Sequence, residues 1–64
     1  MHAKIKKELK EKTETEIVKQ EILRDFYLHR AESQSEEDAA QTKLKASNLE
    51  DTISFNKEFL AFIK

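Results

Sequence analysis

The chain of 64 residues contains no cysteine, no proline, no glycine and no tryptophan. Without cysteine it can form neither a disulfide nor a thiolate metal site. Without glycine it lacks phosphate-binding loops and the sharp turn of a calcium-binding loop. Glycine and proline are also the residues that most often interrupt helices. Their absence therefore favours long helices and excludes several common kinds of ligand site.

Charge of one sign and long apolar runs are missing as well. Twelve Lys and Arg against thirteen Asp and Glu give a net charge of −1, which argues against a general polyanion binder. The longest apolar run, residues 59–63, is far too short to span a bilayer, and no signal-peptide core follows the N-terminal lysines. We therefore expect a cytoplasmic protein that does not associate with membranes.

The residues that are abundant (Lys, Glu, Gln, Ala and Leu) are good helix formers, and no stretch alternates like a β-strand. The sequence predicts a helix over about residues 3–31, a turn at about 32–35 and a second helix over about 36–63. This is an all-α fold, an antiparallel helical hairpin in a single domain over residues 1–64.

The turn is indicated by local charges and caps. His29 and Arg30 suit the negative C-terminal end of one helix, and the acidic residues 36–38 suit the positive N-terminal end of the next. Ser33 and Ser35 are both good N-cap candidates. One rival break exists, because Ser47 opens another capping signature and would give three short helices.

Each predicted helix carries an apolar seam and a second stripe beside it. The second helix has a regular heptad seam, typical of a coiled coil, at Ala39, Thr42, Ala46, Leu49, Ile53, Asn56, Leu60 and Ile63. The seam predicted for the first helix is Ile5, Leu9, Glu16, Gln20, Leu23 and Tyr27. The neighbouring stripes are Val18, Ile22 and Phe26, and Leu44, Phe55, Phe59 and Phe62. Pairing residues whose numbers sum to about 68 places Leu23 near Lys45 and Ile5 near Ile63. The bulky end of the first helix then lies over Ala39, Ala40 and Ala46. Asn56 would either fix the register of the seam or lie at a frayed edge in water.

Two helices can bury only one stripe each, so the second stripes predict self-association. A chain this short rarely builds a sufficient core alone. We expect a homodimer that forms a four-helix bundle. The residues expected to mediate assembly are Ile22, Phe26, Leu49, Ile53, Phe59, Leu60 and Ile63. A monomeric three-helix fold, and a subunit that folds only on another protein through residues 55–62, are the alternatives.

No catalytic, cofactor-binding or metal-binding residues are predicted. His2 and His29 are far apart and lack further ligands at metal-binding spacing. We expect a non-enzymatic interaction, adaptor or regulatory protein. The alternative is a dimeric RNA-binding protein that contacts phosphates through Lys4, Lys6, Lys7 and Lys10. In length and architecture alone, it resembles small plasmid-encoded RNA-binding hairpins. The lysine patch contains no arginine or aromatic residue. The Lys4–Glu8 and Lys7–Glu11 pairs would also fit an ordinary solvated helix face.

Overall fold

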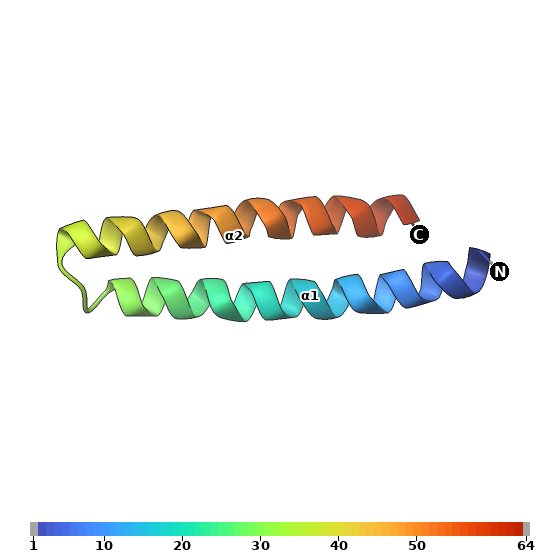
Figure 1. Cartoon of the computed structure of the whole chain (residues 1–64), viewed down its shortest axis with the longest axis horizontal. Coiled ribbons are helices and arrows are strands. Elements are labelled where there is room, and N and C mark those ends of the chain that lie inside the picture. The colour runs from blue at the N-terminus through green and yellow to red at the C-terminus, as the bar shows by residue number, and fades with distance from the viewer. Residues whose placement is uncertain (1, 64) are drawn as a thin grey trace.

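The computed structural model describes residues 2–63, which form two helices, α1 (His2–Ala31) and α2 (Glu36–Ile63). The helices lie side by side and antiparallel, so that the start of α1 and the end of α2 lie at the same end of a rod (Figure 1). The rod measures 52 × 14 × 11 Å along its principal axes. The predicted all-α antiparallel hairpin is confirmed. Residues 1 and 64 of the predicted domain lie outside the described residues.

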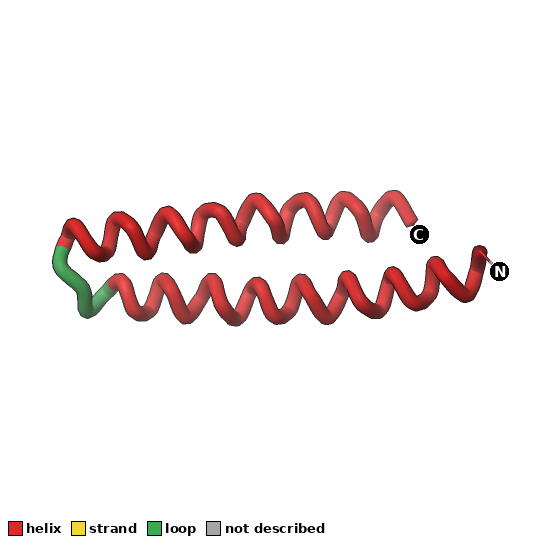
Figure 2. Tube along the Cα trace, in the orientation of Figure 1, coloured by secondary structure: helices red, strands yellow, loops and turns green. Residues whose placement is uncertain are grey.

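A short turn joins the helices, and Figure 2 shows it as the one non-helical segment among residues 2–63. The backbone N–H groups of Glu32, Ser33 and Gln34 donate to the carbonyls three residues earlier at 3.2–3.3 Å. These tighter bonds satisfy carbonyls that the end of an α-helix would leave open. No described residue has a positive φ, so this turn does not need glycine.

Ser35 is the cap that starts α2. Its carbonyl accepts the N–H of Ala39 at 2.7 Å, and its hydroxyl accepts the N–H of Asp38 at 3.4 Å. Ser33 instead donates its hydroxyl to the Arg30 carbonyl at 3.1 Å. Since α2 continues through Ser47 without a break, the three-helix alternative is wrong.

The seam predicted for α2 is confirmed along its whole length. Ala39, Thr42, Ala46 and Ile53 are buried, and the remaining members, Leu49, Asn56, Leu60 and Ile63, are half-buried. Full burial ends at Ile53, so the hairpin is tightest near the turn and looser towards the open end.

The seam predicted for α1 is wrong in its rotation. Ile17 and Ala31 are buried, whereas Leu9 and Leu23 remain 40% and 42% exposed. Ile5 and Glu16 are exposed too, and only Gln20 and Tyr27 of the predicted set are half-buried. Ala31, Arg24 and Ile17 follow one another at seven-residue intervals, so they share one side of the helix. A small residue is favoured at the turn, where the two helices come close. When Ala31 fills that position, Ile17 on the same side of α1 faces α2, and Leu23 does not.

The predicted register is confirmed in part, since Leu23 and Lys45, which the predicted pairing sets opposite each other, line one groove between the helices. The same pairing would place Gln20 opposite Asn48, but Gln20 bonds to Asn56 instead. One cause is that side chains lean towards the N-terminus of their own helix, which moves each contact partner further along the opposing helix. Another is that α2 begins beyond the end of α1 (Figure 1). The small residues Ala31, Ala39 and Ala46, in the part of the hairpin towards the turn, are each buried.

Candidate interaction surface

Most large apolar side chains of the hairpin are exposed. The exposed set is Ile5, Leu9, Val18, Ile22, Leu23, Phe26, Leu28, Leu44, Phe55 and Phe62. The buried set contains only two large apolar residues, Ile17 and Ile53, together with alanines and a threonine. The hairpin therefore leaves more large apolar residues in water than it covers.

Half of these residues gather on one of the two broad faces of the hairpin. Leu9, Glu16 and Leu23 are spaced by seven residues and lie along one side of the α1 seam. Lys45, Thr52 and Phe59 form the matching row along α2. We call this surface the apolar face and define it by its apolar members, Ile5, Leu9, Leu23, Phe26, Tyr27, Phe55 and Phe59.

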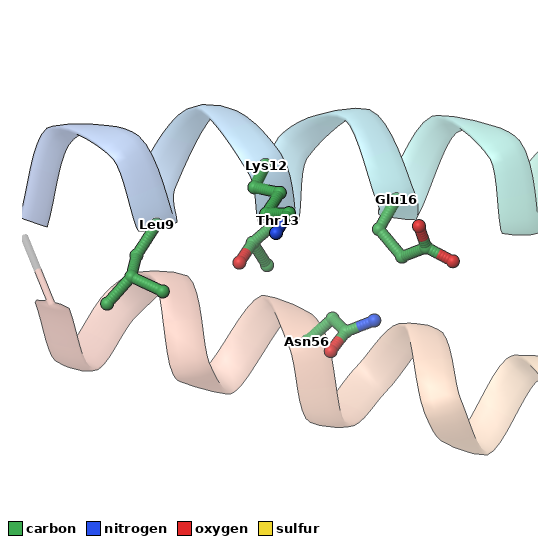
Figure 3. Close-up of a pocket in the computed structure, with 5 residues that line it drawn as sticks. All are labelled: Leu9, Lys12, Thr13, Glu16 and Asn56. Carbon is green, nitrogen blue, oxygen red and sulfur yellow. The ribbon is translucent and has the colours of Figure 1, made fainter. Parts of the chain in front are cut away.

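Two shallow grooves run between the helices on the apolar face. The first is lined by Leu9, Lys12, Thr13 and Glu16 from α1 and by Asn56 from α2 (Figure 3). In that view the Leu9 and Glu16 side chains extend from α1 towards α2. The second is lined by Leu23, Tyr27, Lys45, Asn48, Leu49 and Thr52. The apolar face is thus a furrowed surface whose furrows contain both apolar and charged side chains.

The opposite side of the two seams is mainly charged. Its rows at seven-residue spacing are Lys7, Glu14 and Glu21 on α1, and Lys43, Glu50 and Lys57 on α2. We call this surface the charged face. Leu28 continues the row of Lys7, Glu14 and Glu21 on α1. It is a large apolar residue that is exposed on the charged face. The two faces of one small hairpin therefore differ sharply in chemistry.

Arg24 ties the helices together at the border of the charged face. Its Nη1 donates to Oε1 of Glu50 at 2.7 Å, and its Nε donates to Oδ1 of Asp25 at 3.1 Å. These hydrogen bonds to Asp25 and Glu50 raise the pKa of Arg24 above its ordinary value. Among residues 2–63, the ion pairs of the hairpin are those of Arg24 with Asp25 and with Glu50.

Asn56 lies in the seam and is bonded there. Its Nδ2 donates to Oε1 of Gln20 at 3.0 Å, across the two helices. Near the turn, the Thr42 hydroxyl donates to Oε1 of Gln34 at 2.6 Å. No buried side-chain nitrogen or oxygen of the described part of the chain lacks a partner. The interpretation that Asn56 points into water is wrong, because its side chain is half-buried and bonds across the seam.

The residues predicted to mediate assembly fall into two groups. Ile53 is buried within the hairpin, and Leu49, Leu60 and Ile63 are half-buried in its seam. Phe59 and Phe26 lie on the apolar face, and Ile22 lies on the outer side of α1 with 65% of its surface exposed. Sequence reasoning missed Leu9 and Leu23 as surface residues because it assigned them to the α1 seam.

The four predicted anion-contacting lysines are all exposed at the open end. Lys6, Lys7 and Lys10 surround a shallow hollow together with Ala3 and Ile63, whereas Lys4 lies on another side of α1. The expected Lys4–Glu8 and Lys7–Glu11 pairs do not form as ion pairs in the part of the chain that the structure describes. Ile63 belongs to the last turn of α2, so these lysines lie beside the negative end of that helix. That turn contains no basic residue.

The described residues contain no group of three or more His, Asp or Glu side chains that could hold a metal ion. Neither α1 nor α2 is long and apolar enough to cross a membrane. Comparison with known proteins gives no match, whether to a family model, to a curated protein or to a solved structure.

Proposed function

We propose that this protein is a non-enzymatic helical module that dimerises through its apolar face into a four-helix bundle. The charged face then remains outside, where it contacts other macromolecules in an adaptor or regulatory role. The observation that carries the proposal is the surface that the single hairpin leaves uncovered.

The hairpin exposes more surface than a folded monomer of its mass. Its accessible surface is 5315 Å² for a mass of 7.5 kDa. Folded monomers of that mass expose about 4,200 Å², so the excess is about 1,100 Å². A standard protein–protein interface buries about 800 Å² on each partner. The excess is therefore of the size that one dimer interface removes.

The chemistry of the excess surface supports the same proposal. Covering an exposed Leu or Phe side chain contributes about 1.5–3 kcal/mol. Leu9, Leu23 and Phe55 are 40%, 42% and 67% exposed, so each offers a corresponding share of that gain. Exposed apolar residues that gather on one face in this way normally mark an interface.

Light scattering on a size-exclusion column, over a dilution series, tests the proposal with a matched pair of variants. Leu23 is 42% exposed on the apolar face and Leu28 is 44% exposed on the charged face of the same helix. We expect the wild type to have twice the chain mass, Leu23→Glu to be a monomer, and Leu28→Glu to remain a dimer. A wild type that is monomeric at all concentrations, with full helicity, would overturn the proposal.

A second candidate function is RNA binding at the lysine-lined hollow. It is favoured by the convergence of Lys6, Lys7 and Lys10, none of which forms an ion pair with a described carboxylate. Replacing these three lysines with Gln should then abolish gel retardation of RNA at moderate salt, whereas Gln at Lys43 and Lys57 should weaken it little. Retardation that is equal in both variants, or absent in the wild type, would contradict this function.

A further inference from the structure

The order of side chains along the apolar face indicates how a second copy would lie on it. We infer that the two copies pack with their α1 helices against each other and antiparallel, around a two-fold axis between residues 17 and 18. Glu16 of each copy then pairs with Lys19 of the other. This inference rests on the proposed dimer and specifies its geometry.

The first support is the near symmetry of α1 about that point. From the open end towards the turn, the outer part of its apolar face has the order Ile5, Leu9, Lys12, Glu16, Lys19, Leu23, Phe26 and Arg30. An apolar pair thus stands on each side of a charged centre. Reversing one copy about the centre sets Leu9 against Phe26 and Glu16 against Lys19. It also lays the aliphatic stem of Lys12 over Leu23, where the ammonium group can still reach water.

Both charges at the centre are available for this contact. Glu16 and Lys19 are exposed, and neither forms an ion pair with another described residue. They lie three positions apart on the same side of α1, so a two-fold axis between them creates two identical pairs. An interface with complementary charges at its centre is also more specific than an apolar surface alone.

The phenylalanines of α2 fit the same axis. Gln20 of α1 contacts Asn56 of α2, so the level of residues 17 and 18 on α1 corresponds to the region of residues 55–59 on α2. The axis therefore brings Phe55 and Phe59 of one copy against Phe59 and Phe55 of the other. Phe55 is 67% exposed in the single hairpin, and this contact would cover it.

Other two-fold arrangements are less favourable. Parallel α1 helices would set Glu16 against Glu16 and Lys12 against Lys12, which is a repulsive contact. Packing α1 on α2 of the second copy would place the Glu16 carboxylate against the Phe59 region, where it would lose water without gaining a cation. Only the antiparallel α1 pairing gives each central charge an opposite partner.

Charge reversal tests the geometry, with dimer affinity as the readout. In Glu16→Lys or Lys19→Glu alone, both central pairs become repulsive, so we expect the dimer to weaken on the order of tenfold. An equimolar mixture of the two variants should regain the wild-type affinity, because the introduced lysine of one variant faces the introduced glutamate of the other. The double variant Glu16→Lys/Lys19→Glu should regain it too.

Glu14→Lys is the matched control, since it makes the same charge change two residues away on the charged face. It should leave the dimer affinity unchanged, and circular dichroism should show full helicity for every variant. A wild-type dimer that Glu16→Lys does not weaken, or a mixture that gains no affinity, would overturn the antiparallel geometry while the dimer itself stands. A monomeric wild type would overturn both.

Discussion

The seam and the apolar face use similar residue types, but the chain covers only the seam. Ile53 in the seam is 3% exposed, whereas Leu23 on the apolar face is 42% exposed. The two regions share helices, and a rotation of α1 by less than one third of a turn would exchange them. The buried row of α1 ends in Ala31 at the turn, where Ala39 of α2 is buried as well, whereas the exposed row ends in Arg30. Close packing of small residues therefore outweighs the number of large apolar residues in a row.

The largest expected effect separates the seam from the exposed surface. Ile53→Ala should lower the free energy of unfolding by about 2–4 kcal/mol, because it leaves a cavity between the helices. Ile22→Ala, at a site that is 65% exposed, should lower it by less than about 0.5 kcal/mol. Urea denaturation at one fixed protein concentration measures both. Equal losses in the two variants would mean that the seam is not the core of the hairpin.

Overpacking the seam near the turn tests the role of the small residues. Ala46 is 2% exposed, so Ala46→Leu should destabilise the hairpin by about 1–3 kcal/mol by forcing the helices apart. Ala40→Leu is the control, because Ala40 is exposed and a leucine there meets no steric obstacle. It should leave the stability nearly unchanged. The prediction fails if both leucines leave the urea midpoint where it was.

Removing the polar pair of the seam should have a smaller effect. Asn56→Ala leaves the Gln20 amide half-buried without its partner, which should cost about 1 kcal/mol. A double-mutant cycle with Gln20→Ala isolates the pair, and we expect a coupling of about 0.5–1 kcal/mol. Simple additivity of the two single variants would show that the pair does not stabilise the seam.

The smallest effect is expected at the cap of α2. Ser35→Ala should cost about 1 kcal/mol or less, since the hydroxyl accepts one N–H at 3.4 Å, a long bond. Ser33→Ala should cost less, because its hydroxyl donates only to a carbonyl near the end of α1. Thermal unfolding followed by circular dichroism ranks the two variants, and the reverse order would contradict the assignment of Ser35 as the cap.

The helix limits, the turn and the α2 seam could be predicted from the sequence because their determinants are local. His29, Arg30 and the acidic residues 36–38 mark two helix ends within ten positions of each other. The α2 seam follows a regular heptad series, which specifies the one side of the helix that is buried.

The rotation of α1 and the hydrogen-bond partners across the seam could not be predicted in this way, because contacts between distant residues decide them. The row of Leu9, Glu16 and Leu23 contains more large apolar residues than the row of Ile17, Arg24 and Ala31. The second row is nevertheless buried, since Ala31 fits at the turn and Arg24 reaches Glu50, 26 positions away. The apolar face consequently became visible only with both helices in place.

The most direct measurement of the central claim uses the absence of cysteine from the chain. A single thiol is introduced as Leu23→Cys on the apolar face or as Leu28→Cys on the charged face, and its modification rate is followed over a range of protein concentrations. The proposed dimer predicts that Leu23→Cys is protected at high concentration and becomes reactive on dilution, while Leu28→Cys reacts at one rate throughout. Equal rates for the two thiols at every concentration would contradict the claim that a second copy covers the apolar face.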